Sequence, residues 1–398
     1  MKIVKKLIYP TKIFAISVIF LLFLTILPYF NAEMYDFHPK TTFSGHSWFN
    51  PYFTKDSLLL KANFHSHTYA WGKLTNGHHT PAEVHSQFKQ LGYDIPTISN
   101  YHQIDTTGKH DTSVIYIPTY EHGYNVKKRH HQPLGASSIV WLDFVFLQTL
   151  NHKQYMLNCI APTCSVLTIN HPSFSNGFDA SDFTLLKNYD LIEVLNHYRT
   201  SIPHWDSALS SGISAMIVSN DDTKHLDSKG QCGAYWTMIY AQERTPTAVY
   251  SSLKRGNAYG VRGIDANNGD KLDAVSVNND SLTVQLKTTV DSIRFIHQHG
   301  IVKEVFSHTN KATIPLLHQD TYVRTEVYVD SLTTYFLNPV FRYSNYPFTT
   351  RTQLPSVNTH NTVLYRGFVA AIELALLGII VSIIQSMRKK KIEKVTTE

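Results

Sequence analysis

The stretch SLLLKANFHSHT, residues 57–68, decides the interpretation of this chain. Its apolar part predicts a short buried strand, and His65 and His67 follow where that strand ends. Side chains at positions i and i+2 of an extended chain point to the same face, so both imidazoles can reach one metal ion. A His-x-His pair also occurs by chance, so the rest of the chain has to support a metal site.

Short apolar runs recur along the chain, and each ends in polar side chains. Helical stretches alternate with these runs, such as residues 80–92, which begin with a Thr-Pro-Ala-Glu capping box and end at a glycine. This alternation predicts an α/β fold, either a barrel or a parallel sheet. In a parallel barrel the carboxyl ends of the strands meet at one rim, where active sites are built. The side chains that this would gather are His65, His67, His102, Glu121, His171, His197, Asp221, Asp222 and His225.

Histidine is concentrated in the same region. Of 22 histidines, 15 lie between residues 61 and 230. Buried imidazole and carboxylate groups are costly unless something compensates them, and divalent cations bind both. We therefore expect two or three divalent metal ions, with zinc, manganese and iron all compatible with these ligands.

The order of the motifs resembles that of the PHP (polymerase and histidinol phosphatase) family. NFHSHT resembles its opening His-x-His motif, IPTYEHG the strand with the metal-bridging glutamate, INHP its His-Pro motif, and SNDDTKH its closing Asp-x-His motif. TPAEVHSQFKQLGYD with IPTISNYH, IEVLNH and SLKRGNAYGVRG resemble the connecting elements. The likeness covers roughly residues 60 to 262 and implies a distorted (β/α)7 TIM-like barrel with metal-dependent phosphoesterase activity.

The resemblance also implies roles for individual residues. By motif match the metal ligands are His65, His67, Glu121, His171, Asp222 and His225. His102 and His197 are further ligand candidates, and Asn76, His78 and His79 lie where the family often supplies another ligand. The residues expected to act in catalysis are His65, Glu121, Asp222, His225 and Arg199. Arg199 suits bidentate phosphate binding, although a surface salt bridge is its alternative role.

Two departures from the family pattern affect these assignments. Asn100-Tyr101-His102 stands where the family has Asp-His, and asparagine is a poorer ligand than aspartate. The closing motif is longer than Asp-x-His, so either Asp221 or Asp222 is the ligand. A binuclear site is therefore an alternative to a trinuclear one. His130 and His131 follow three basic residues, and we predict that they lie in a solvated loop.

Two apolar segments flank the histidine-rich region, at residues 13–30 and 365–386. A transmembrane helix needs about 20 apolar residues. Basic clusters in residues 1–12 and 387–398 predict that both termini are cytoplasmic and that the intervening residues face the other side. A cleaved signal peptide is the alternative for the first segment. An interfacial helix is the alternative for the second, which contains Glu373.

The remaining organisation follows from the change of pattern after residue 270. Residues 31–59 are a lead-in segment and residues 60–269 the predicted barrel. DAVSVNNDSLTVQL alternates with period two around an Asn-Asn-Asp turn, which predicts a small all-β appendage over residues 270–360.

The net charge of +6 comes largely from the two termini, so it indicates membrane topology, and we expect no stable nucleic-acid complex.

The sequence thus predicts a membrane-anchored, extracytoplasmic hydrolase of phosphoric esters. Its substrate would be a small-molecule, nucleotide or oligonucleotide phosphate, a sugar phosphate or a lipid head group. One alternative is a surface binding module on a degenerate barrel. The departures from the family pattern at Asn100 and Lys224 support this alternative. The other is a metal-dependent amidohydrolase, which shares the His-x-His motif but usually needs a bridging lysine on a mid-chain strand, and no lysine is so placed.

Overall fold

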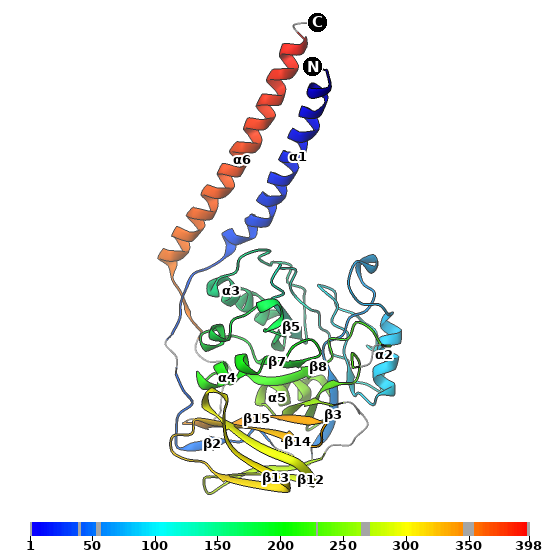
Figure 1. Ribbon diagram of the computed structural model, residues 1–398, viewed down its shortest axis with the longest axis vertical. Coiled ribbons are helices and arrows are strands. Elements are labelled where there is room, and N and C mark those ends of the chain that lie inside the picture. The colour runs from blue at the N-terminus through cyan, green and yellow to red at the C-terminus, as the bar shows by residue number, and fades with distance from the viewer. Residues whose placement is uncertain are drawn as a thin grey trace. The chain divides into compact units, whose positions relative to one another are not determined.

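The computed structural model describes residues 2–38, 41–52, 57–227, 230–263, 271–344 and 354–395. The chain divides into two compact units. The terminal unit comprises Met1–Phe37, Leu142–Met156 and Pro355–Glu398, and the core unit comprises His38–Trp141 and Leu157–Leu354 (Figure 1).

The terminal unit contains two long apolar helices that pack side by side, α1 (Lys2–Ile26) and α6 (Thr359–Val395). Residues 10–31 and 359–389 are long and apolar enough to cross a membrane. Both helices continue into the stretches predicted as separate basic tails. Glu373, the acidic residue of the second apolar segment, is buried. The structure confirms two candidate spans, while their orientation and the side that the core unit faces stay predictions.

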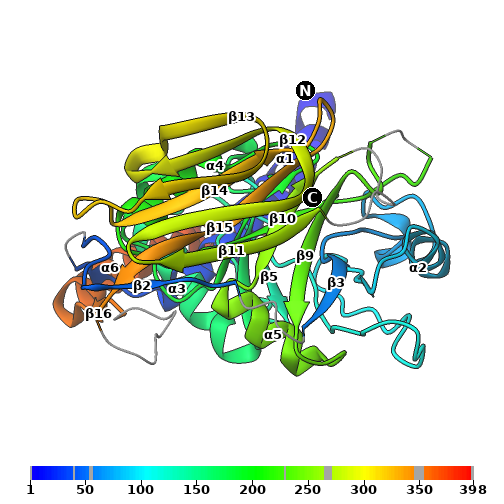
Figure 2. The same ribbon diagram turned by 90° about the horizontal axis from the view of Figure 1, so that it is seen from below.

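A ten-stranded sheet dominates the core unit, with strand order β11-β12-β14-β15-β10-β9-β3-β4; β13 pairs with β12 and β2 with β15. Only β3 and β4 pair in parallel. Figure 2 shows the strands of its β-rich part lying side by side. The strands are β2 (Ser47–Phe49), β3 (Leu58–Asn63), β4 (Ile95–Pro96), β9 (Tyr235–Ala241), β10 (Ala258–Arg262), β11 (Leu272–Asn278), β12 (Ser281–His297), β13 (Ile301–Pro315), β14 (Tyr322–Tyr328) and β15 (Thr334–Tyr343).

A second sheet of four strands lies in the order β5-β6-β7-β8. Its strands are β5 (His130–Leu134), β6 (Val166–Asn170), β7 (Leu191–Asn196) and β8 (Met216–Asn220). β6, β7 and β8 are parallel, and β5 is antiparallel to β6. Every residue of the four strands is buried, as in sheets covered on both faces. The carboxyl ends of the three parallel strands therefore meet at one edge.

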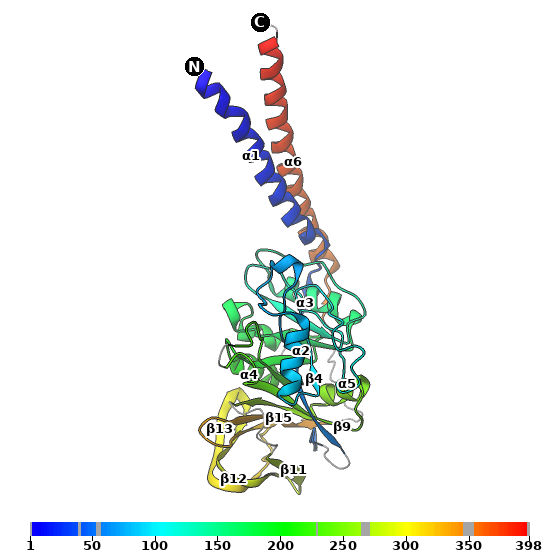
Figure 3. The same ribbon diagram turned by 90° about the vertical axis from the view of Figure 1, so that its right-hand side faces the viewer.

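Helices connect several of these strands. α2 (Pro81–Gln90) begins with the predicted capping box, in which Thr80 and Glu83 satisfy each other's backbone N–H groups. α5 (Pro246–Arg255) ends at Gly256, whose φ of +81° suits a residue without a side chain. Figure 3 shows α4 (Ile202–Ser210) and α5 on opposite sides of the core unit. α3 (Leu150–Ile160) begins in the terminal unit.

The mixed α/β class is confirmed, but the described strands do not pair around a complete (β/α)7 barrel. The segment IPTYEHG, residues 117–123, which resembles the strand with the bridging glutamate, joins the fold through isolated bridges, among them Glu121 with Tyr101 and Thr119 with Leu134. Pro118 explains part of this weak pairing, because proline lacks the N–H group that a strand donates. Residues 272–343 carry the predicted β structure, and their strands extend the same sheet as β3. The predicted boundary at residue 269 lies outside the described residues.

Candidate metal centre

His65 and His67 follow β3, and both are buried. Their Nε2 atoms lie 3.2 Å apart. Nδ1 of His65 lies 2.9 Å from Oε1 of Glu193, nearer than its other polar neighbour, the Asn170 amide at 3.3 Å. A carboxylate only accepts hydrogen bonds, so Nδ1 carries a proton and Nε2 is the atom that remains for a metal.

Glu121 lies at the middle of the cluster. Its Oε1 is 2.7 Å from Nδ1 of His130 and 3.1 Å from Nε2 of His171. Its Oε2 is 3.1 Å from Nε2 of His67. Among the described residues this Oε2 forms no well-aligned hydrogen bond, although Glu121 is fully buried. A buried carboxylate oxygen without a donor is costly, and a cation would satisfy it.

Asp222 completes the cluster from the residues after β8. Its Oδ1 lies 3.3 Å from Nε2 of His65 and 3.2 Å from Nε2 of His67. The structure therefore distinguishes the two neighbouring aspartates. Asp221 accepts the backbone N–H groups of residues 233–235 instead, and burial raises its pKa to about 6.

Six residues thus bring metal-binding atoms together in three overlapping groups. Within each group the ligand atoms all lie within 4.8 Å of one another. The groups are His65, His67 and Glu121; His65, His171 and Asp222; and Glu121, His130 and His171. Because the groups share members, the set suits neighbouring cations held by common ligands. His171 (φ 26°) and Asp222 (φ 50°) have left-handed backbone, a strained conformation that is common at functional sites.

The charges within the cluster favour a cation. Burial opposes protonation of His65, but Asp222, Glu121 and Glu193 outweigh it and raise the pKa of His65 well above its usual value. Burial disfavours ionised Glu121, but His130 and His65 outweigh it and lower the pKa of Glu121 well below its usual value. The pKa of Asp222 is likewise lowered, mainly by His65 and Lys224. Ionised carboxylates around imidazoles are the environment that divalent metals select.

Glu193 supports the cluster from β7, and the sequence prediction missed it. Its Oε1 accepts from His65 and from Nδ2 of Asn220, and its Oε2 accepts from the His171 N–H and from Nδ2 of Asn196, all at 2.9–3.0 Å. A carboxylate fixed in this way orients a ligand imidazole. The available signal was an acidic residue inside the apolar run LIEVL, where a carboxylate needs partners.

His130 corrects another prediction. It was expected in a solvated loop with His131, and both are buried in β5. The loop prediction is wrong because β5 pairs with β6 in a register that sets His130 opposite Asn170, the neighbour of His171. The basic residues 127–129 just before β5 gave a misleading surface signal.

Three predicted ligands lie outside the six-residue cluster. Nε2 of His102 accepts the Gly123 N–H at 3.1 Å, and its ring stacks on Trp141. His197 is half-buried beside Tyr198, and burial lowers its pKa. His225 stacks on His78 with ring centroids 3.9 Å apart.

The other polar candidates also have separate positions. The Asn100 amide hydrogen-bonds Thr68, at 2.8 Å from its N–H and 2.7 Å from its hydroxyl, and Nε2 of His79 accepts the Leu226 N–H. Asn76 is exposed. Arg199 is exposed and lines a surface hollow with Ser173, Ser175, Asn176, Tyr198 and Thr200.

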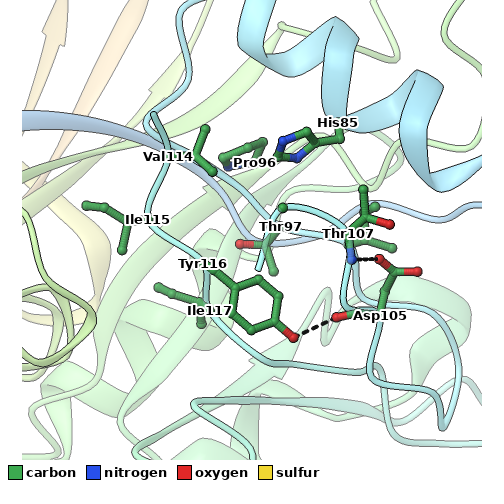
Figure 4. A pocket seen from close by; sticks show the side chains of 11 residues that line it. His85, Pro96, Thr97, Asp105, Thr107, Val114, Ile115, Tyr116 and Ile117 are labelled. Atoms are coloured by element: carbon green, nitrogen blue, oxygen red, sulfur yellow. Dashed lines mark hydrogen bonds between the residues drawn. The ribbon is translucent and has the colours of Figure 1, made fainter. Parts of the chain in front are cut away.

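A separate cavity, lined by residues of 85–117, contains none of the six cluster residues (Figure 4). Asp105 pairs with two of its polar groups, since its carbonyl accepts from the Tyr116 hydroxyl and its carboxylate from the Thr107 N–H, both at 2.7 Å. The chemistry of the chain therefore centres on the six-residue cluster.

Comparison with known proteins adds little detail. No protein-family model matches the chain, and no curated protein matches it. Among solved structures, it is similar to a two-domain protein from Bacteroides vulgatus that contains a predicted PHP-like metal-dependent phosphoesterase. The identity is 13% and the TM-score 0.38, over 80% of this chain and 98% of that one. The assignment of chemistry therefore rests on the side chains described above.

Proposed function

We propose that this chain is a metal-dependent phosphoesterase of the PHP type, with His65, His67, Glu121, His130, His171 and Asp222 as its metal ligands. The observation that carries the proposal is the convergence of four imidazoles and two carboxylates in one buried site. The Glu121 oxygen without a donor supports a bound cation in particular. Divalent metals bound there would activate a water molecule and stabilise the charge on phosphoryl oxygens.

The protein's own residues prepare the site in two ways. Glu193 orients His65, and the hydrogen bonds of Glu193 to two asparagines hold that carboxylate in place. Lys224 supplies a fixed positive charge, because its Nζ lies 2.6 Å from Oδ1 of Asp222 and 4.5 Å from the centre of the Tyr198 ring. A charge held at that position attracts an anionic phosphate.

Arg199 adds a second positive charge near this site. It lies in the hollow that also contains Ser173, two residues after His171. We propose that the phosphate group enters from this hollow, with Arg199 as its exposed contact and Lys224 as its half-buried one. His102, His197 and His225 are then assigned to the surroundings of the site.

Membrane anchoring belongs to the same proposal. Two candidate spans and the basic residues beyond them support a core unit held outside the cytoplasm. Of the competing functions, a degenerate binding module keeps the support of Asn100, because this side chain bonds to Thr68 and supplies no ligand from the position where the family has aspartate.

The test uses the full-length protein in detergent with Mn²⁺ or Zn²⁺. We expect it to hydrolyse p-nitrophenyl phosphate or its bis-ester and to retain bound metal after dialysis. His65→Ala should lose both properties, while His110→Ala, which changes an exposed histidine, should keep both. If His65→Ala retains metal and activity, the centre is assigned wrongly. Hydrolysis of amides but not phosphoesters would favour the amidohydrolase.

A further inference from the structure

Aromatic side chains lead from the metal centre to the protein surface. The Tyr101 ring stacks on the ligand His67, with centroids 4.8 Å apart. The Tyr101 carbonyl accepts a hydrogen bond from the Trp71 indole at 2.8 Å. Trp71 in turn contacts Trp141, with ring centroids 6.0 Å apart. Trp71 is therefore separated from the ligand His67 by one residue, and Trp141 by two.

These tryptophans belong to an exposed apolar group. The Tyr124 hydroxyl donates to the Trp141 carbonyl at 3.1 Å. Leu74 follows Trp71 in the same turn, where its N–H bonds the Trp71 carbonyl, and Val126 follows Tyr124. We call Trp71, Leu74, Tyr124, Val126 and Trp141 the apolar rim. Their exposed fractions are 48%, 89%, 49%, 65% and 57%.

The rim is flanked by positive charge. Lys73 lies between Trp71 and Leu74, and Lys127 and Lys128 follow Val126; all three are exposed. Residues 69–82 and 122–142 contain no aspartate or glutamate. Exposed tryptophan and aliphatic side chains next to lysines are the composition of surfaces that bind anionic membranes. Stacking of a soluble aromatic ligand would account for the tryptophans but not for Leu74, Val126 and the lysines.

The backbone of both loops supports a dedicated surface. Trp71, Lys73 and Lys128 have φ values of 51°, 69° and 56°, in the left-handed region that non-glycine residues rarely adopt. Such a conformation costs free energy and is usually retained where the displayed side chains have a function. The backbone conformation that exposes the rim and its lysines therefore lowers the stability of the fold.

Chain connectivity links the rim to the first candidate span. Trp141 directly precedes Leu142–Met156, which belongs to the terminal unit. Within that unit Phe144 packs on Tyr29 with ring centroids 4.9 Å apart, and the Phe146 N–H donates to the Tyr29 hydroxyl. Tyr29 lies in the short helix η1 (Leu27–Asn31), at the end of the span over residues 10–31. Phe144 follows Trp141 by three positions.

We infer that the apolar rim docks on the surface of an anionic lipid bilayer, and that the metal centre acts on a phosphate ester of a lipid head group. The substrate part rests on the proposed phosphoesterase function; the docking part does not. In the reaction a water oxygen would bond to phosphorus while the bond from phosphorus to the lipid oxygen breaks. That lipid oxygen would take up the proton that the water gives up, so phosphatidic acid would yield diacylglycerol and phosphate, and phosphatidylglycerol would yield diacylglycerol and glycerol phosphate.

The distribution of tryptophan makes docking measurable in the full-length protein. Of the five tryptophans, Trp205 and Trp236 are buried, Trp48 is half-buried, and none lies in the two long helices. Lipids brominated in their acyl chains quench only tryptophans that reach the hydrocarbon. Protein reconstituted in brominated vesicles of phosphatidylcholine with phosphatidylglycerol should therefore be quenched through Trp71 and Trp141.

Variants decide the outcome. The double variant Trp71→Phe with Trp141→Phe should lose most of the quenching, while Trp48→Phe should keep it. Replacement of Lys73, Lys127 and Lys128 by glutamate should reduce quenching in vesicles with phosphatidylglycerol more than in vesicles of phosphatidylcholine alone. Equal quenching of the double variant and the unmodified protein, or none in either, would overturn docking.

A second arm tests the substrate with phosphatidic acid and phosphatidylglycerol in vesicles, against p-nitrophenyl phosphate and adenosine monophosphate in solution. Turnover of a vesicle lipid, lowered by the double variant, is the expected result. Quenching with turnover of soluble esters alone would overturn the lipid substrate. Turnover of adenosine monophosphate without quenching would assign the rim to a soluble aromatic ligand. Failure with all four substrates would count against the phosphoesterase itself, and quenching would still report docking.

Discussion

The metal centre and the network around Arg324 are both buried clusters of charged side chains in the core unit, but their charges are balanced differently. Arg324 donates two hydrogen bonds to Asp206, at 2.7 and 2.9 Å, and one to Glu326 at 2.6 Å. The second oxygen of Glu326 accepts from the Tyr328 hydroxyl at 3.1 Å. This network joins α4 to β14, and its donors and acceptors match.

The metal centre is matched only in part, because Lys224 donates to Oδ1 of Asp222 while Oε2 of Glu121 forms no hydrogen bond with the described residues. Nε2 of His65 and Nε2 of His67 face each other at 3.2 Å, and both face Oδ1 of Asp222. Burial of charge alone therefore does not indicate function. A buried network with its hydrogen bonds completed stabilises the fold, whereas buried acceptor atoms without donors make a suitable site for a cation.

The largest effect should come from Glu121→Gln, which removes the carboxylate that faces most of the imidazoles but keeps its size. A bound metal contributes several kcal/mol to catalysis, so we expect phosphoesterase activity to fall by about 1,000-fold or more, with loss of metal. Metal analysis and rates on p-nitrophenyl phosphate measure this. Full activity in a metal-loaded Glu121→Gln protein would show that Glu121 is not needed for function, and the functional difference between the two clusters would no longer hold.

Arg324→Met should show the opposite behaviour. Removing one partner of a buried ion pair leaves uncompensated charge on Asp206 and costs about 3–5 kcal/mol of unfolding free energy. Urea denaturation measures the loss, and folded protein should keep its metal. Arg294→Met is the matched control, because Arg294 packs on the Tyr328 ring but forms no ion pair among the described residues. A loss no larger than that of the control would show that the network is dispensable.

A smaller effect is expected from Glu193→Gln. The variant weakens the hydrogen bond that orients His65 without removing a metal ligand. Loss of such a partner typically lowers metal affinity by about 10- to 100-fold. Competition with a fluorescent chelator measures the affinity. An unchanged metal affinity would show that Glu193 stabilises the fold, as the Arg324 network does, and does not tune the metal site, although it contacts His65.

The sequence predicted the part of the site that follows from strand ends. His65, His67, Glu121, His171 and Asp222 each stand near the end of an apolar run, and the structure brings them together. His130 was not predicted as a ligand because it begins a strand that runs antiparallel to its neighbour β6. No short sequence pattern shows that the start of such a strand lies at the edge where the parallel strands end. Glu193 was not predicted because its role in orienting His65 depends on asparagines that are not adjacent to it in the sequence.

The fold was predictable where its signals are local. The caps of α2 and α5 and the alternating pattern of the β-rich part are visible in short windows of sequence. Sheet order is not local: β2 near the start of the chain pairs with β15, so that Phe49 lies opposite Phe341. No short-range pattern encodes a contact over almost 300 residues, and for the same reason the extent of barrel closure could not be predicted.

The pairing of β10 with β15 has a practical consequence for anyone who wishes to isolate the histidine-rich region. Protein shortened to residues 60–262 would end at the last residue of β10 and expose one side of that strand, including the hydrogen-bonding groups now covered between residues 259 and 262. An uncovered apolar strand recruits other copies of itself. Such a fragment should precipitate, and soluble protein should require chain that continues through residue 343.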